Sequence, residues 1–361
     1  MEKYRVGIVG ATGMVGQRFI SLLKDHPWFE VNCVAASARS AGKTYREAVG
    51  ERWAFSWKIP EKVAGMTVVD AADIDEVSKH VDFVFCAVDM KKDEIRALEE
   101  AYAKHEIPVV SNNSACRGIE DVPMVVPEIN ADHLAVIEAQ KKRLGTKNGF
   151  IAVKPNCSIQ SYVPALTPLL DFEPEKVSVC TYQAISGAGK TFKTWPEMVD
   201  NVIPYIGGED EKSENEPLKL WGHVEDGKIV NAALPVISAQ CLRVACSDGH
   251  MAAVSVSFKK KPTIEQIKER WANYETEAQR LELPSAPKPF LQYFEDPSRP
   301  QTRLDRDFQN GFGVSIGRLR EDKLFDYRFV CLSHNTVRGA AGGGILTAEL
   351  LCRKGYIPHR V

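Results

Sequence analysis

The feature that most constrains this chain is a glycine-rich segment near its beginning. Residues 6–16 read VGIVGATGMVG, a short apolar run followed by glycines at positions 10, 13 and 16. This pattern predicts a strand, a tight turn and the first turn of a helix. Glycines at such a turn let backbone N–H groups approach a pyrophosphate, and the positive end of the helix faces that anion. The spacing departs from the commonest dinucleotide fingerprint, but its context favours nucleotide binding over a turn needed for packing alone.

The first 150 residues alternate apolar runs with amphipathic stretches. Strands are expected at Arg5–Val9, Val31–Ala36, Val81–Val88 and Ile107–Ser111, and helices at Met14–Asp25 and Lys91–His105. Parallel strands that are covered on both faces are nearly continuously apolar, as Val81–Val88 is. Strands separated by helices therefore predict a doubly wound parallel sheet.

After about residue 150 the pattern changes to strict alternation. Strands are expected at Lys176–Tyr182 and Ala252–Phe258, and a hairpin at Gly313–Leu319 and Leu324–Leu332. Such strands predict a mixed or antiparallel sheet with one face covered by helices. The other segments are expected to be a helix at Thr263–Leu281, an acidic loop at Gly207–Pro217 and an irregular connection at Ala286–Arg303.

The end of the chain predicts a helix, Gly339–Lys354, with Gly355 as its cap. Its small residues would let it pack closely on another backbone, and we expect it to return to the first domain. The predicted organisation is a nucleotide-binding domain of residues 1–150, completed by residues 335–361, and a catalytic and dimerisation domain of residues 151–334. The fold class is α/β combined with α+β.

Composition excludes several classes of protein. The 361 residues are 44% apolar and 26% charged, with a net charge of −2, so nothing suggests a nucleic-acid surface. No apolar run is long enough to span a membrane. The nine cysteines include no Cys-x-x-Cys pair, which predicts a reducing, cytoplasmic location without a disulfide framework or a metal site.

The end of the second expected strand bears on the choice of cofactor. NAD sites usually carry an acid there, which binds the ribose hydroxyls. This chain instead has Ser37, Ala38, Arg39 and Ser40. Arg39 is suited to a 2′-phosphate, so we expect NADP.

A candidate nucleophile follows the apolar run 150–153. Cys157 lies in the sequence Pro155-Asn156-Cys157-Ser158, and a helix expected to begin near Ile159 would lower the pKa of its thiol. A thiolate can add to an aldehyde and pass through a hemithioacetal to a thioester. His250, in the turn before the strand at Ala252–Phe258, is a candidate proton acceptor. Arg243, among apolar neighbours, is suited to bind a carboxylate.

Together these residues resemble aspartate-semialdehyde dehydrogenases, in particular their archaeal and fungal branch. The resemblance runs nearly end to end and rests on five segments: residues 10–16, residues 37–43, residues 155–158, residues 183–189, and Arg243 with His250. It implies a Rossmann domain followed by a mixed-sheet catalytic domain, in a homodimer or homotetramer. The implied reaction is NADP-dependent interconversion of L-aspartate 4-semialdehyde plus phosphate with L-4-aspartyl phosphate, a step in lysine, threonine and methionine biosynthesis.

The resemblance also implies roles for individual residues. Cys157 would be the acyl-enzyme nucleophile, His250 the general acid/base and Gln183 the residue that orients the substrate. The implied substrate ligands are Arg243 and Glu209 for the α-carboxylate and α-amino group, and Arg117 and Lys212 for phosphate. The implied cofactor-binding residues are Gly10, Thr12, Gly13, Met14, Val15, Gly16, Ser37, Arg39 and Ser40, with Ser186, Gly187 and Asn335 beside the nicotinamide.

Three other classes of protein share part of this pattern. A reductase of the same architecture could act on malonyl-CoA or N-acetylglutamyl phosphate, and single residues do not exclude a thioester substrate. A short-chain dehydrogenase needs Tyr-x-x-x-Lys, which none of the ten tyrosines provides. A non-catalytic NADP sensor with Cys157 as a redox switch would not need Gln183, Arg243 and His250 together.

Overall fold

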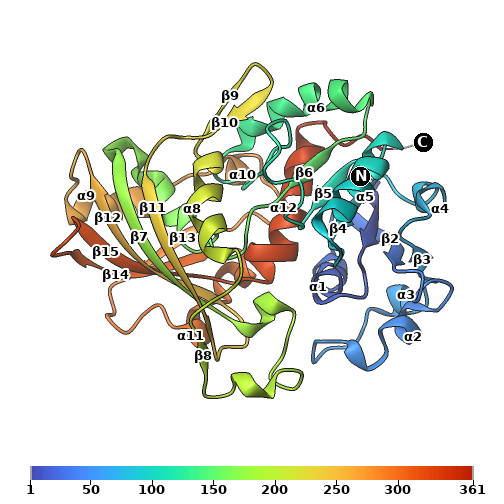
Figure 1. Ribbon diagram of the computed structural model, residues 1–361, viewed down its shortest axis with the longest axis horizontal. Coiled ribbons are helices and arrows are strands. Elements are labelled where there is room, and N and C mark those ends of the chain that lie inside the picture. Colours follow the sequence, from blue (N-terminus) through green and yellow to red (C-terminus); the bar gives the residue numbers. More distant parts are fainter. Residues whose placement is uncertain (1, 360–361) are drawn as a thin grey trace.

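The first sheet consists of six parallel strands. The computed structural model describes residues 2–359, so the last two residues of the expected segment 335–361 lie outside the described part (Figure 1). The strand order is β3-β2-β1-β4-β5-β6. The strands are β1 (Tyr4–Val9), β2 (Phe29–Ala36), β3 (Val69–Asp70), β4 (Phe83–Cys86), β5 (Val109–Ser111) and β6 (Ile151–Val153). This order confirms the doubly wound sheet and places a crevice at the carboxyl ends of β1 and β4, where the order reverses.

Short helices connect these strands and cover the sheet. They are α1 (Met14–Leu23), α2 (Tyr45–Val49), α3 (Glu61–Ala64), α4 (Ile74–Ser78), α5 (Lys92–Lys104) and α6 (Ile137–Leu144). The helix α1 ends two residues before the predicted Asp25. Its apolar side holds Phe19, which stacks on Phe85 with ring centroids 4.3 Å apart.

The last helix returns to this first sheet, as the sequence predicts. Helix α12 (Gly342–Arg353) packs against α1 and β5. A Cβ at Gly344 would lie only 3.0 Å from the ring of Phe19, which explains the small residues at this point. A single π-helical turn, Val337–Ala341, precedes α12, so the expected helix begins irregularly. The division of the chain at residues 150 and 334 stays a prediction.

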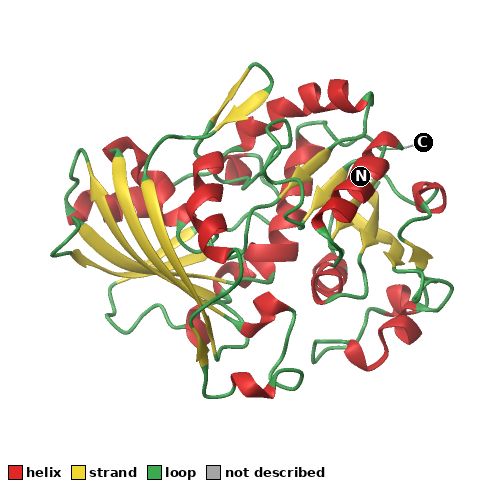
Figure 2. Ribbon diagram, in the orientation of Figure 1, coloured by secondary structure: helices red, strands yellow, loops and turns green. Residues whose placement is uncertain are grey.

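The second sheet has seven strands in the order β13-β14-β15-β12-β7-β11-β8. Its strands are β7 (Pro174–Gln183), β8 (Val202–Ile203), β11 (Val236–Val244), β12 (His250–Phe258), β13 (Leu291–Phe294), β14 (Val314–Glu321) and β15 (Tyr327–Ser333). Strands β7 and β11 are parallel, whereas β12 is antiparallel to β7 and the predicted hairpin β14–β15 is antiparallel. In Figure 2 the two sheets lie at opposite sides of the molecule, with helices between them.

Two segments of this half differ from the prediction. The expected helix at Thr263–Leu281 is two helices, α9 (Ile264–Ala272) and α10 (Glu277–Arg280). Thr263 and Thr276 each cap a helix with their side chains, so the second threonine begins a new helix instead of continuing the first. Residues 286–303 are not wholly irregular, because they include β13, which pairs in parallel with β14.

The acidic segment Gly207–Pro217 is not a loop but most of helix α8 (Glu209–Leu220). Three acids in its first turn suit the positive end of a helix. Two carboxylates of the helix face β11, where Asp210 accepts from the backbone N–H of Cys241 at 2.8 Å and Glu214 from that of Ala239 at 3.0 Å. Because these carboxylates accept hydrogen bonds from the backbone of a strand, the helix does not need a stripe of apolar residues. The acidic sequence therefore gave no helical period, and the prediction of a loop was wrong.

The remaining elements are short. They are helices α7 (Val163–Leu166) and α11 (Thr302–Asp305), and a two-stranded ribbon of β9 (His223–Glu225) and β10 (Lys228–Val230). Within residues 2–359 no helix is long and apolar enough to cross a membrane.

Candidate active site

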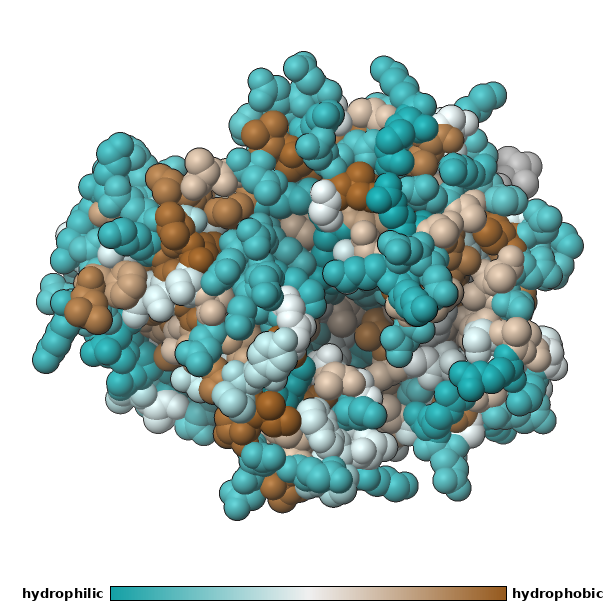
Figure 3. Space-filling model, in the orientation of Figure 1, coloured by the Kyte–Doolittle hydropathy of each residue, from teal (hydrophilic) through white to brown (hydrophobic). Residues whose placement is uncertain are grey.

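Strand register brings three of the predicted residues to one end of the second sheet. Gln183, the last residue of β7, is paired with Arg243 near the end of β11. His250 is the first residue of β12. This strand is antiparallel to β7, so its first residue lies at the end of the sheet where β7 ends. All three side chains are buried. Figure 3 shows the face of the molecule on which a recess opens between its two halves, with mainly hydrophilic residues around it.

Cys157 joins this group from the other sheet, in the turn after β6. Its Sγ lies 3.4 Å from Nε2 of His250. On its other side, a Cβ at Gly339 would lie 2.9 Å from Cβ of Cys157, so the π-helical turn packs directly behind this cysteine. The predicted contact of a thiol and an imidazole is therefore present.

The helix that we expected to begin near Ile159, after Cys157, does not form there. Residues 157–162 form turns, and α7 begins only at Val163 and lasts four residues, because Pro164 and Pro168 prevent a longer regular helix. The N-terminus of α7 therefore does not lie directly after the thiol, as the prediction required. Burial and the charge of Glu209 raise the Cys157 pKa, and the cations Lys154, Arg117 and Arg243 oppose this rise.

His250 is fully buried, and its ring is held from both sides. The backbone N–H of Ala184 donates to Nδ1 at 3.0 Å. Burial and the nearby Arg243 lower the pKa of His250 to about 3. The imidazole is therefore neutral at working pH, and its pKa is far below the ordinary value of 6.5.

Glu209, at the start of α8, is the acid around which the polar side chains gather. Asn156 donates to both of its oxygens at 3.0 Å, Gln183 at 3.2 Å and Lys212 at 2.8 Å. Burial alone would raise its pKa, but these hydrogen bonds, above all that of Lys212, lower it. Glu209 is thus a buried carboxylate, suited to bind an ammonium group.

Arg243 lies against the same group. Its Nη1 donates to the carbonyl oxygen of Ala184 at 2.7 Å, so one alanine orients both Arg243 and His250 through its two backbone groups. Gly187 leaves the space they need, since a Cβ there would lie 2.8 Å from Nη1 of Arg243 and 3.0 Å from Nε2 of His250. Gly187 therefore borders both side chains directly.

The two predicted phosphate ligands line one cavity of about 590 Å³. Each is paired with a carboxylate of α8: Arg117 with Glu216 at 2.9 Å, and Lys212 with Glu209 at 2.8 Å. Within residues 2–359, the buried Nε of Arg117 has no hydrogen-bond partner. Guanidinium and ammonium groups at one cavity wall suit a phosphate.

The glycine-rich turn borders a cavity of about 580 Å³ at the crevice of the first sheet. Gly10 has φ +90°, and a Cβ there would lie 2.3 Å from the carbonyl oxygen of Ala87. Six predicted residues line this cavity: Gly10, Thr12, Gly13, Ser37, Arg39 and Ser40. Helix α1 has neither a capping side chain nor an acid in its first turn, so its positive end is left for an anion.

The other predicted cofactor residues lie nearby. Met14 and Ser186 line a neighbouring cavity, and Val15 and Gly16 are not among the residues that line either. Gly16 instead packs against the turn, where a Cβ would lie 2.3 Å from the carbonyl oxygen of Gly10. Asn335 donates to Ser186 at 2.8 Å and accepts from the N–H of Gly249 at 2.7 Å, which ties it to the turn before His250.

Several residues of these sites were not predicted. They are Lys43 and Arg52 in the dinucleotide cavity, and Lys154, Asn156 and Glu216 around Cys157. Lys154 had a visible signal, since it follows β6 directly and the carboxyl ends of parallel strands border ligand sites. Glu216 had no such signal in the sequence, because the acidic segment was not recognised as a helix.

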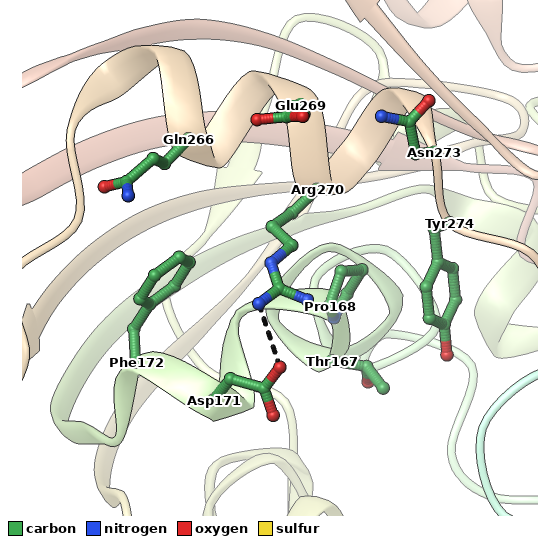
Figure 4. A pocket seen from close by; sticks show the side chains of 9 residues that line it. All are labelled: Thr167, Pro168, Asp171, Phe172, Gln266, Glu269, Arg270, Asn273 and Tyr274. Atoms are coloured by element: carbon green, nitrogen blue, oxygen red, sulfur yellow. Dashed lines mark ion pairs between the residues drawn. The ribbon is translucent and has the colours of Figure 1, made fainter.

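A further cavity, of about 640 Å³, contains none of the predicted residues. It lies between α9 and the 3-10 helix Thr167–Phe172 that follows α7, and Arg270 and Asp171 form an ion pair of 3.0 Å across it (Figure 4). Both side chains are largely exposed, so this is a surface groove with a solvated ion pair. Among residues 2–359, no group of three or more His, Cys, Asp or Glu side chains is arranged to hold a metal ion.

Comparisons with known proteins match both halves of this chain. Residues 5–137 match a family model described as the NAD binding domain of semialdehyde dehydrogenases, and residues 166–338 match the model of their dimerisation domain. Three relatives are named aspartate-semialdehyde dehydrogenase. The one from Schizosaccharomyces pombe is 45% identical, and those from Aspergillus fumigatus and Archaeoglobus fulgidus are each 43% identical; in each case the match covers 98% of this chain and at least 99% of the relative.

A solved structure from Candida albicans, described as aspartate semialdehyde dehydrogenase with NADP, covers 99% of this chain at 39% identity with a TM-score of 0.89, and the match spans 100% of that protein. One from Vibrio cholerae, at 24% identity and a TM-score of 0.73, shares the fold. The full-length similarity, the two domain matches and the shared architecture lead to one conclusion: the chain belongs to the aspartate-semialdehyde dehydrogenase family.

Proposed function

We propose that this chain catalyses the NADP-dependent interconversion of L-aspartate 4-semialdehyde plus phosphate with L-4-aspartyl phosphate. One observation carries the proposal: the thiol of Cys157 lies 3.4 Å from Nε2 of His250. The same chain has a cavity at its glycine-rich turn and another lined by Arg117 and Lys212. The names of the relatives support it, as does the NADP with which the Candida albicans protein was solved.

In this reaction the thiolate of Cys157 attacks the aldehyde carbon and produces a hemithioacetal oxyanion. Nε2 of His250 lies beside the sulfur, and since Nδ1 accepts from the N–H of Ala184, a neutral imidazole carries its proton on Nε2. From there it can donate to that oxygen and stabilise its charge. When bound, NADP supplies the acceptor for the hydride that leaves the same carbon. A thioester then remains on Cys157.

The buried polar side chains fix the substrate. Arg243 is suited to the α-carboxylate and Glu209 to the α-ammonium group, while Gln183 bridges from β7 to Glu209 at 3.2 Å. Arg117 and Lys212 hold phosphate for its attack on the thioester, which frees the thiolate again. Both cations must then exchange a carboxylate of α8 for the ligand.

The residues of the first sheet fit NADP. Gly10 and the uncapped end of α1 form a cradle for the pyrophosphate. Arg39 follows β2, and Lys43 and Arg52 line the same cavity. Three cations at this wall favour a cofactor with a 2′-phosphate over one without.

A malonyl-CoA reductase is the second candidate, and the site disfavours it. Malonyl-CoA carries a carboxylate but no ammonium group. The buried carboxylate of Glu209, which Asn156, Gln183 and Lys212 contact, would then meet no cation of the substrate, and Lys212 would stay paired with it. An amino-acid substrate uses all of these groups.

We further propose that the chain is a homodimer or homotetramer located in the cytoplasm. One face of the second sheet carries exposed side chains, among them Tyr182 of β7 and Val236 of β11, while alternate residues are buried under helices. A second copy of the chain could cover this face. Its strands lie within residues 166–338, which match the family model of the dimerisation domain. All nine cysteines, which lie within the described residues, are free, in keeping with a reducing compartment. Light scattering of Ser178→Arg, on the exposed face, should report a smaller assembly; an unchanged mass would reject this surface.

An absorbance assay tests the activity. With semialdehyde, NADP and phosphate, we expect NADPH formation that depends on all three. Cys157→Ala should remove at least about 10³-fold of the rate while NADP binding persists. The proposal fails if the wild-type enzyme turns over malonyl-CoA and not semialdehyde, or if Cys157→Ala keeps full activity.

A further inference from the structure

One short segment of the chain contacts both members of the thiol–imidazole pair. It consists of residues 334–339, which lead from the end of β15 into the π-helical turn. At the end of this segment, a Cβ at Gly339 would lie 2.9 Å from Cβ and 3.3 Å from Cα of Cys157. Near its start, Asn335 accepts from the backbone N–H of the residue before His250. The position of the segment therefore affects the distance between the thiol and the imidazole.

A buried ion pair anchors this segment. Arg338 directly precedes Gly339, and its guanidinium binds both oxygens of Glu128, Nη1 to Oε1 at 2.6 Å and Nη2 to Oε2 at 2.7 Å. Both side chains of the pair are at most 1% exposed. Nη1 also donates to the carbonyl oxygen of Phe312, and the guanidinium lies 4.6 Å from the ring centre of Phe290. A guanidinium that is bound at two oxygens and packed on a ring has one orientation, so the turn that carries it is fixed.

Glu128 in turn belongs to a loop that is bound to the strand leading to Cys157. Two backbone hydrogen bonds, of 2.8 and 2.9 Å, join residues 123–125 of this loop to Val153, the last residue of β6. The chain continues from β6 into the turn that holds Cys157. The ion pair therefore closes a ring of contacts, which runs from β6 through the cysteine and the π-helical turn back to the loop.

We propose that the pair of Arg338 and Glu128 is a positioning device for the reaction, because it holds the segment 334–339 against Cys157 and His250. Neither residue acts on the substrate directly; both act through the backbone of the segment. Burying two charges costs about as much free energy as their attraction returns, so the pair contributes geometry more than net stability. The inference rests on the proposed role of Cys157 as the nucleophile.

The test starts from Arg338→Met in the full-length protein. Steady-state assays with semialdehyde give kcat and KM, and iodoacetamide labelling without substrate, followed by mass spectrometry, gives the reactivity of Cys157. A shift approaching 1 Å at a reacting centre costs up to about 10²-fold in rate. We therefore expect kcat to fall about 10- to 100-fold, with KM for semialdehyde and phosphate within about twofold of the wild type, and labelling of Cys157 to change with kcat.

Two further variants test whether the two residues act as one unit. Glu128→Gln and the double variant should each lose about as much kcat as Arg338→Met, because the second substitution removes nothing that the first has left. Arg338→Lys keeps a cation without the planar fork, so it should recover only part of the rate. If Arg338→Met does not fold, Glu128→Gln and Arg338→Lys still give these comparisons.

Arg5→Met is the matched control. Arg5 and Asp82 also form an ion pair, of 2.7 Å, but it lies at the amino ends of β1 and β4, whereas the crevice lies at their carboxyl ends. This variant should lower the melting temperature and keep the wild-type kcat and labelling rate.

Three results would overturn the proposal. The first is a wild-type kcat and labelling rate in Arg338→Met with only a lower melting temperature, which would assign the pair to stability alone. The second is an equal loss of kcat in Arg5→Met, and the third is a double variant whose loss is the product of the single losses. Failure of the proposed function would be seen separately, because the labelling needs no substrate and would still report the position of Cys157 in an enzyme inactive on semialdehyde. NADP binding by each variant checks that it is folded.

Discussion

Gly187→Ala should damage catalysis from a position that carries no chemistry. An added Cβ would lie 2.8 Å from Nη1 of Arg243, whereas ordinary contacts begin near 3.4 Å, so about 0.6 Å of movement is needed (3.4 − 2.8). Neither neighbour can yield freely, since Ala184 holds both Arg243 and His250. Overpacking of this kind costs about 1–3 kcal/mol. A displacement approaching 1 Å at a reacting centre can cost up to about 10²-fold in rate.

We therefore expect kcat/KM for semialdehyde to fall about 10- to 100-fold. The affinity for NADP should fall less than this, although the resemblance implies that Gly187 lies beside the nicotinamide. Initial rates of NADPH formation and fluorescence titration of the cofactor measure the two quantities. Gly65→Ala is the matched control, because its added Cβ meets nothing within 4 Å, and it should leave both unchanged. Wild-type kcat/KM in Gly187→Ala would refute the packing argument, and an equal loss in both variants would show that the effect is not specific to the site.

Three further predictions follow from single contacts. Arg39→Leu should raise the KM for NADP about 10-fold or more and leave that for NAD nearly unchanged; an equal effect on both cofactors would exclude a 2′-phosphate contact. Arg338→Met leaves the fully buried Glu128 without its bidentate partner and should cost about 3–5 kcal/mol in urea unfolding, so a loss below about 1 kcal/mol would contradict it. The folded pKa of His250, about 3, is below its unfolded value of 6.5, so the unfolded state binds the extra proton between these values and stability falls as pH drops. The wild-type protein should therefore lose roughly 1 kcal/mol more than His250→Gln per pH unit from 6 to 4, and parallel curves would show that His250 is not buried as a neutral group.

The parts of the fold that the sequence predicted are those with a strong apolar period. The strands at Arg5–Val9 and Lys176–Tyr182 were recognised because a covered sheet demands apolar side chains at fixed spacing. Helix α8 was missed because its acids bind the backbone of β11 and the positive helix end, interactions that depend on tertiary neighbours. The break between α9 and α10 was signalled by Thr276, a capping residue that also fits a helix interior.

The identity of the site residues was easier to predict than their electrostatics. Cys157, His250, Gln183 and Arg243 come together as expected because strand ends converge. Their pKa values could not be predicted, since burial depends on the whole fold and reverses the expected direction for the thiol. The pairing of Lys212 with Glu209 likewise depends on a helix that the sequence did not reveal.

The most direct measurement is a rapid-mixing experiment without phosphate, followed by mass spectrometry of the peptide that contains Cys157. With semialdehyde and NADP alone, we expect a burst of about one NADPH per active site and an aspartyl group bound to that sulfur. Added phosphate should remove the acyl group and restore steady turnover. A burst with the acyl group on another residue, or steady NADPH formation with no modified Cys157, would contradict covalent catalysis at this thiol.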